Sequence, residues 1–196
     1  MSLTTKSSAR TRPTDGSPSP TTTLSVNAMR ALAVLRISLG FVFLWAFVDK
    51  LFGLHYSTPT ARAWIHGGSP TKGFLASVEV GPLQSTFHSI AGAGWADWMF
   101  MIGLLGIGVA LIAGIGLRIA AVCGVALLAL MWLAEYPPAQ HTSGGAPSQS
   151  TNPFMDYHAI YAVGVVAVAL CDAGSTWGLG GWWARQPLVE RHAWLR

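Results

Sequence analysis

Four long apolar runs constrain the fold of this chain more than any other feature. They cover about residues 28–54, 98–115, 119–134 and 154–171. A helix needs about 20 apolar residues to cross a bilayer core. The second run is long enough alone, and polar residues at the ends extend the two that follow it. None alternates polar and apolar residues as barrel strands do. We therefore predict an all-α, polytopic membrane protein built on a bundle of four transmembrane helices.

The composition supports this fold class. Of 196 residues, 52% are hydrophobic and only 10% are charged, whereas soluble domains have about 25% charged residues. The net charge of +4 does not indicate nucleic-acid binding, because the basic residues lie at the ends of apolar runs. The two cysteines, Cys123 and Cys171, lie inside apolar runs and form no CxxC motif. We expect neither a disulfide framework nor a c-type haem.

The connections between the runs differ in length. Only Gly116, Leu117 and Arg118 separate the second run from the third, which predicts a tight antiparallel hairpin. About 45 residues join the first run to the second. Ser69-Pro70 is a typical helix start, so we expect a short helix from there to about residue 79. Residues 82–90 predict another, with Leu83, Phe87 and Ile90 on one face. Both helices would lie on the membrane surface or cap the bundle.

The chain divides into three parts on this interpretation. Residues 1–27 form a disordered tail that is too polar to build a core. Residues 28–172 form the transmembrane domain, and residues 173–196 form a Trp-rich basic tail suited to the membrane interface.

Lysine and arginine predict the orientation in the membrane. Both tails and the 116–118 turn carry eight lysine and arginine residues: Lys6, Arg10, Arg12, Arg30, Arg118, Arg185, Arg191 and Arg196. The two long loops carry three such residues: Lys50, Arg62 and Lys72. Positive residues accumulate on the cytoplasmic side, so we predict a plasma-membrane protein with both termini in the cytoplasm and both long loops outside.

This topology brings ionisable residues from all four helices to the outer face. They are Asp49, Lys50, Asp97, Glu135, Asp156 and His158. One interpretation is that they mark helix ends at the headgroup level, and for Asp97 we favour it. The other is a polar pocket beneath the loop helices, with His158 as its titratable member. Trp45 would lie one turn below Asp49 and line that pocket. Both interpretations remain open for Asp49, Glu135 and His158.

Arg36 lies about two turns into the first helix, on the inner side. Its side chain either reaches the cytoplasmic headgroups or forms a charge pair with Asp172 within the bundle. Asp49 is excluded as its partner, because 13 helical residues separate the two by about 20 Å.

Two further patterns concern glycine and histidine residues. Gly106, Ala110 and Gly114 form a stripe of small residues on the second helix, which indicates helix packing. The loop histidines lack metal-ligand spacing, so we expect no metal site. They are His55, His66, His88 and His141. Because there is also no phosphate-binding or dinucleotide motif, nothing supports nucleotide chemistry.

Several short patterns together carry a family resemblance. They are Leu35-Arg36, Gly40-Phe41, Phe43-Leu44-Trp45 and Asp49-Lys50-Leu51 in the first run, residues 67–75 in the outer loop, Gly114-x-Gly116-Leu117-Arg118 at the turn, and Asn152-Pro153-Phe154 with Asp156 and His158 at the fourth run. On these residues the chain resembles the DoxX/DoxD family of small four-helix membrane proteins. The resemblance covers about residues 28–172.

The resemblance implies a subunit of a quinone-linked redox system. DoxD-type proteins belong to a thiosulfate:quinone oxidoreductase that makes tetrathionate with a second subunit, DoxA. Other members are thought to serve as membrane partners of soluble enzymes that handle sulfur or oxidative stress. The partners expected here are therefore membrane lipid, a DoxA-like or sulfurtransferase-like protein, and a second copy of the chain.

The first functional hypothesis is a quinone-dependent oxidoreductase subunit. Asp49, Glu135 and His158 would exchange protons with the quinone, while Trp45, Lys50 and Asp156 would bind it. The second hypothesis is a non-catalytic scaffold that recruits a soluble redox or sulfur-handling enzyme. A small transporter is the third and weakest hypothesis, because the chain shows no inverted repeat or broken helix.

Overall fold

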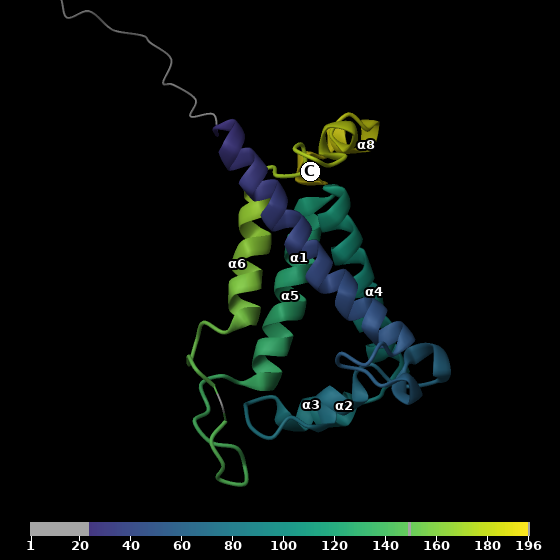
Figure 1. Cartoon of the computed structure of the whole chain (residues 1–196), viewed down its shortest axis with the longest axis vertical. Coiled ribbons are helices and arrows are strands. Elements are labelled where there is room, and N and C mark those ends of the chain that lie inside the picture. Colours follow the sequence, from purple (N-terminus) through teal and green to yellow (C-terminus); the bar gives the residue numbers. More distant parts are fainter. Residues whose placement is uncertain (1–23, 149, 196) are drawn as a thin grey trace, which may run out of the picture.

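Four long helices pack into a bundle in the computed structural model, which describes residues 24–148 and 150–195. They are α1 (Val26–Phe52), α4 (Gly94–Ala113), α5 (Leu117–Glu135) and α6 (Tyr157–Leu170). Helix α1 crosses the bundle diagonally, and α5 lies between α4 and α6 (Figure 1). The described residues contain no β-strand, which confirms the all-α class. The predicted disordered tail covers residues 1–27: residues 1–23 lie outside the described residues, and Val26 and Asn27 already belong to α1.

Three of these helices are long and apolar enough to cross a membrane: α1, α4 and α5, with 27, 20 and 19 residues. Helix α6 has 14 residues and is about 21 Å long at 1.5 Å per residue, which is shorter than a bilayer core. The fourth run begins with Phe154, but the helix begins only at Tyr157 because Asp156 caps it: its Oδ1 accepts from the Ala159 N–H at 2.9 Å. Three membrane-capable helices are observed, and the fourth membrane span stays a prediction.

Glycines end α1 and α4 where the chain must turn. Gly53 has φ +69° and donates to the Asp49 carbonyl at 2.8 Å. Gly114 has φ +73° and ends α4, and Gly116, at φ +57°, precedes α5. These left-handed conformations suit glycine because it has no Cβ. The predicted tight hairpin between α4 and α5 is confirmed.

The closest approach of α1 and α4 depends on one glycine from each helix. A Cβ on Gly40 would lie 2.8 Å from Ile112, and a Cβ on Gly108 would lie 2.8 Å from the Leu44 backbone nitrogen. Gly106, by contrast, faces open space. The prediction that Gly106 serves helix packing is therefore wrong, because the phase of α4 turns Gly108 toward α1 instead.

The outer loop contains two short helices, as predicted, but both are shorter than expected. Helix α2 spans Lys72–Ala76 and α3 spans Gln84–Ile90, preceded by the 3-10 turns η1 (Thr60–Arg62) and η2 (Trp64–His66). Ser69 does act at the start of α2, where its Oγ accepts from the Lys72 N–H at 3.1 Å.

The same outer-loop helices pack across the end of the bundle. Phe87 is buried together with Val78 and Ala134, and Leu83 and Ile90 pack against them. The predicted apolar face of the second loop helix is confirmed. Because Ala134 belongs to the last turn of α5, this face holds the loop over the end of that helix (Figure 1).

The C-terminal segment packs on the opposite end of the bundle. It contains α7 (Gly180–Trp183), α8 (Pro187–Arg191) and the turn η3 (Ala193–Leu195). The Leu179 N–H donates to the Ala113 carbonyl at 2.8 Å, and the Arg118 guanidinium donates to the Ala193 carbonyl at 3.1 Å. This segment and the start of α1 lie at the same end (Figure 1).

Candidate functional site

The ionisable residues predicted for the outer face form two separate groups. The end of α1 lies beside the start of α4, and the end of α5 lies beside the start of α6 (Figure 1). Asp49, Lys50 and Asp97 therefore belong to one side of the bundle, and Glu135, Asp156 and His158 to the other. No hydrogen bond or ion pair joins the two groups among residues 24–148 and 150–195. The two groups thus lie at the same end of the bundle, but they do not form one common pocket.

Asp49 stabilises the first turn of the outer loop. It is 1% exposed. Its Oδ1 accepts from the Tyr56 N–H at 3.2 Å, and its Oδ2 accepts from the Ser57 N–H at 3.0 Å and the Ser57 hydroxyl at 2.6 Å. These donors occupy both carboxylate oxygens, so the geometry gives Asp49 a structural role and separates it from the predicted catalytic group.

Asp97 has a similar role at the other end of the loop. It is 6% exposed, and its Oδ1 accepts from the Ser69 hydroxyl at 2.8 Å and from the Thr71 N–H and hydroxyl at 3.0 and 2.6 Å. Asp97 therefore has a structural role beyond the predicted one, in which it only marks a helix end at the headgroup level. Asp49 and Asp97 together hold the loop to the ends of α1 and α4.

Lys50 and Trp45 also lie on the α1–α4 side. The Lys50 ammonium donates to the Ser57 hydroxyl at 3.4 Å and lies 5.9 Å from the centre of the Phe100 ring. Trp45 packs against Tyr56, with ring centres 5.1 Å apart. Neither residue lines the cavity described below. Their predicted role in binding a quinone therefore receives no geometric support from that cavity.

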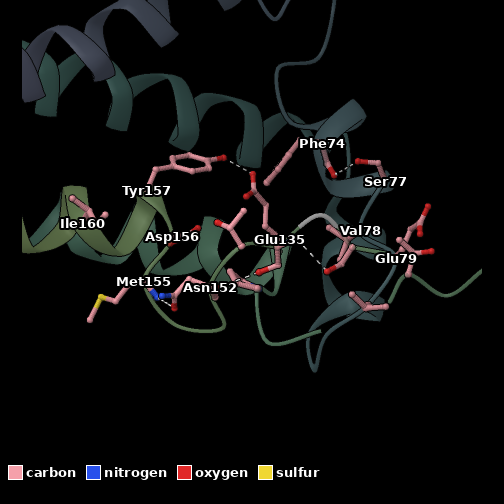
Figure 2. A pocket seen from close by; sticks show the side chains of 17 residues that line it. Phe74, Ser77, Val78, Glu79, Glu135, Asn152, Met155, Asp156, Tyr157 and Ile160 are labelled. Atoms are coloured by element: carbon pink, nitrogen blue, oxygen red, sulfur yellow. Dashed lines mark hydrogen bonds between the residues drawn. The ribbon is translucent and has the colours of Figure 1, made fainter. Parts of the chain in front are cut away.

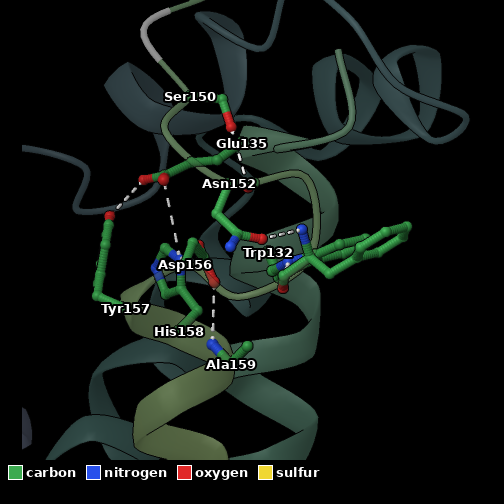
Figure 3. Close-up of polar contacts among 9 residues, drawn as sticks. Trp132, Glu135, Ser150, Asn152, Asp156, Tyr157, His158 and Ala159 are labelled. Atoms are coloured by element: carbon green, nitrogen blue, oxygen red, sulfur yellow. Dashed lines mark hydrogen bonds and ion pairs between the residues drawn. The ribbon is translucent and has the colours of Figure 1, made fainter. Parts of the chain in front are cut away.

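Glu135, Asp156 and His158 form the second group, which we call the α5–α6 cluster (Figure 3). His158 Nδ1 lies 2.7 Å from Asp156 Oδ2 and 3.8 Å from Glu135 Oε2. The three side chains differ in exposure: 35% for Glu135, 13% for Asp156 and 1% for His158. The structure thus brings together three of the six residues predicted for the site, and these three come from the end of α5 and the start of α6.

Tyr157 belongs to the same arrangement, although the sequence analysis did not single it out. Its hydroxyl donates to Glu135 Oε1 at 2.6 Å, and its ring centre lies 4.0 Å from that of His158. The sequence feature that could have identified Tyr157 is its position between Asp156 and His158, in the first turn of a helix that begins beside the end of α5. The tyrosine fixes one oxygen of Glu135 and leaves the other facing His158.

A cavity of about 680 Å³ lies next to the cluster. Glu135, Asp156 and Tyr157 line it on the helix side, and the 77–80 segment lines it on the outer-loop side (Figure 2). Its apolar lining includes Phe74, Met155 and Ile160. Met155 and Ile160 are more than half exposed, so the apolar wall continues onto the outer surface of the bundle. The cavity therefore combines acidic and apolar side chains in its lining.

His158 has one ring nitrogen in the cluster and one without a partner. Nε2 is buried and forms no hydrogen bond within the described residues. Burying a polar atom without a partner is costly. In the tautomer with its proton on Nδ1, the ring donates to Asp156 Oδ2 at 2.7 Å. The cluster can then hold a proton or a cation between its oxygen and nitrogen atoms.

Arg36 does not form the predicted charge pair with Asp172. Its side chain is fully buried, at 0% exposed, whereas Asp172 is exposed. The guanidinium instead donates to backbone carbonyls where α4 ends and where the chain leaves α6. The acceptors are the oxygens of Leu111, Ile112, Ala173, Thr176 and Trp177.

Glycines make this arrangement of carbonyls possible. A Cβ on Gly114 or Gly178 would lie 3.0 Å from an Arg36 nitrogen, and a Cβ on Gly174 would lie 2.3 Å from the Gly114 oxygen. Arg36 satisfies carbonyls that a helix end leaves unpaired, and so joins α1, α4 and the segment after α6. Its interior position also excludes the alternative that it reaches the headgroups.

Comparison with known proteins agrees with the resemblance seen in the sequence. Searches of curated proteins and of solved structures found no significant match. A family model described as DoxX matches residues 31–136, which extends from α1 to one residue beyond Glu135 and does not reach Asp156 or His158. The match covers more than half of the sequence and includes the three helices that are able to cross a membrane, so the chain is a membrane protein that belongs to the DoxX family.

Proposed function

We propose that this protein is the membrane subunit of a quinone-linked redox system, and that the quinone binds in the cavity beside the α5–α6 cluster. The observation that carries the proposal is the contact between a group of ionisable side chains and a cavity with an apolar wall. Membership of the DoxX family supports the same class of function. The cavity, at about 680 Å³, falls in the common range of about 300–1,000 Å³ for small-molecule sites.

The lining suits the two chemically different ends of a quinone. The exposed side chains of Met155 and Ile160 offer an apolar path from the lipid for the isoprenoid tail. Asp156, Tyr157 and Glu135 offer hydrogen-bonding groups for the head group. A quinone supplies two-electron redox chemistry and takes up two protons when it is reduced to a quinol.

The residues of the cluster would handle those protons. Glu135 is the most exposed of the three and faces the cavity, so it exchanges protons with the head group and with water. His158 and Asp156 share a proton across 2.7 Å. The Tyr157 hydroxyl holds Glu135 in place at 2.6 Å. In this proposal the electrons come from a partner protein, such as a DoxA-like or sulfurtransferase-like enzyme.

The proposal places the protein in the plasma membrane with both termini in the cytoplasm. The cavity and the outer loop then face outward, while the basic C-terminal segment faces the cytoplasm, as the distribution of lysine and arginine favours. Thiosulfate is one candidate electron donor, following the DoxD-type proteins of the sequence resemblance.

Photolabelling with an azido-quinone would test the location of the site. The full chain is reconstituted in lipid nanodiscs, irradiated with the probe and mapped by mass spectrometry, with excess unmodified quinone as the competitor. We expect labels that the competitor suppresses at residues 134–137 and 150–160. If such labels occur only at residues 45–58, the site lies on the Asp49 side. If the competitor suppresses no label, quinone binding is contradicted.

A scaffold that recruits a soluble enzyme is the second candidate, and the outer loop favours it. Buried Asp49 and Asp97 hold that loop in a defined shape, which a docking surface needs. Crosslinking in native membranes distinguishes the candidates. A dominant soluble partner attached to residues 54–93, without competed quinone labelling, would favour the scaffold.

A further inference from the structure

We infer that the α5–α6 cluster is a binding site for a divalent transition-metal ion, with Glu135, Asp156 and His158 as its protein ligands. The inference does not depend on quinone binding. It departs from the expectation of the sequence analysis, which found no metal-ligand spacing. Glu135 lies in a different helix from the other two residues, so the three meet only in the folded chain.

The distances are close to those between ligands of a single small ion. One potential ligand atom from each side chain lies within 4.8 Å of the others. First-row ions bind nitrogen and carboxylate oxygen at about 2.0–2.2 Å. Two ligands on such an ion are then roughly 3–3.5 Å apart by simple geometry. The observed distances from His158 Nδ1, 2.7 Å to Asp156 and 3.8 Å to Glu135, lie on either side of that range.

The surrounding residues orient these atoms. Glu135 Oε1 accepts from the Tyr157 hydroxyl at 2.6 Å, and Asp156 Oδ1 accepts from the Ala159 N–H at 2.9 Å. Each carboxylate therefore has one oxygen fixed by an outer donor and the other facing His158. Metal ligands are commonly held in this way by hydrogen bonds from a second layer of residues.

His158 supplies an independent indication. It is 1% exposed, its Nδ1 points between the two carboxylates, and its Nε2 has no partner among the described residues. The ring can move its proton to Nε2 without breaking a hydrogen bond there, which leaves a lone pair on Nδ1 for an ion. A neutral N–H left unpaired is less costly than a cationic one.

Charge in the cavity points the same way. The described residues that line it include the acids Glu79, Glu135 and Asp156 but no lysine or arginine. No lysine or arginine of the lining therefore offers these carboxylates a counter-charge. A divalent ion supplies it. Imidazole and carboxylate together suit zinc, iron(II) or manganese(II) better than the all-oxygen ions calcium and magnesium.

Equilibrium dialysis of the purified full chain with Mn²⁺ and with Zn²⁺, after treatment with a chelator and without quinone, tests the inference. We expect one ion per chain in the wild type. Glu135→Gln, Asp156→Asn and His158→Gln should each weaken binding by about tenfold or more. Glu79→Gln, which changes a cavity carboxylate outside the cluster, should leave the affinity unchanged. Asparagine is itself a good helix cap, so Asp156→Asn keeps the start of α6.

A spectroscopic measurement on the wild type does not depend on the folding of any variant. Electron spin-echo spectra of the Mn²⁺-loaded wild type should show coupling to one histidine nitrogen. The inference is overturned if the wild type binds no ion, if the nitrogen coupling is absent, or if Glu79→Gln weakens binding as much as the cluster variants do. If the protein binds metal but shows no quinone label that the competitor suppresses, only the proposed function is contradicted. If it shows such a label but binds no metal, only this inference is contradicted.

Discussion

Arg36 is the residue on which the inner half of the bundle depends most. Its five hydrogen bonds end on carbonyls from two segments outside its own helix. Hydrogen bonds to charged groups contribute about 1.5–3 kcal/mol each. Arg36→Gln should therefore lower the free energy of unfolding by about 3 kcal/mol or more, measured by thermal unfolding in detergent.

The matched control is Arg30→Gln, which changes an exposed arginine in the same helix. It should leave stability nearly unchanged. Arg36→Lys should recover only part of the loss, because an ammonium has three donors and no planar fork. Equal stability of Arg36→Gln and Arg30→Gln would show that the carbonyl contacts do not stabilise the fold.

The sequence indicated that Arg36 needed a partner but not which one. A backbone carbonyl carries no side-chain signature, and the glycine-rich segment after α6 offers no pattern from which its path can be inferred. Asp172 was proposed because it ends the fourth apolar run on the same side of the membrane as Arg36. The left-handed backbone at Asp172, with φ +50°, belongs to the turn that brings Ala173 and the carbonyls after it to the arginine.

At the scale of helices, the contact between α1 and α4 gives a second prediction. Gly108→Ala should destabilise the bundle, because the new Cβ would lie 2.8 Å from the Leu44 nitrogen. Gly106→Ala, two residues earlier on the same helix, enters open space and should be neutral or stabilising by about 0.5–1 kcal/mol. Thermal unfolding of the two variants under the same conditions measures this difference in stability. A larger loss for Gly106→Ala would contradict the observed packing.

The attachment of the outer loop gives a third prediction. Asp97→Ala removes the acceptor for the Thr71 N–H and hydroxyl. Losing bonds to a charged acceptor costs about 1.5–3 kcal/mol each, so hydrogen exchange of peptides covering residues 69–76 should rise by about tenfold or more. Glu79→Ala, in the same loop, should leave this exchange unchanged. Unchanged exchange in Asp97→Ala would mean that other contacts hold the loop.

The positions of the helices were predictable, and their lateral arrangement was not. Long apolar runs and glycine turns predicted α1, α4 and α5 to within a few residues. The count of lysine and arginine residues predicted which helix ends lie at the outer face. It did not predict which helices are neighbours at that face. The predicted outer group therefore combined residues that the bundle separates, such as Asp49 and His158.

For the whole molecule, the open question is whether α6 crosses the membrane, since it has only 14 residues. We predict that residues 150 and 175 lie on opposite sides. Ser150→Cys and Ser175→Cys are made in a Cys123→Ala/Cys171→Ala background and treated with a membrane-impermeant maleimide in oriented vesicles. Each should react from one side only, and the sides should differ. Reaction of both from the same side would contradict a fourth span.

The central claim is that the α5–α6 cluster, and not the Asp49 group, forms the functional site. The most direct test is the affinity of a short-chain quinone for the full chain in nanodiscs. Glu135→Gln and Asp156→Asn, which change side chains that line the cavity, should each raise the dissociation constant by about tenfold, the equivalent of one lost hydrogen bond of about 1.4 kcal/mol. Asp49→Asn should leave it unchanged. Equal affinities in all variants, or a loss only in Asp49→Asn, would contradict the account.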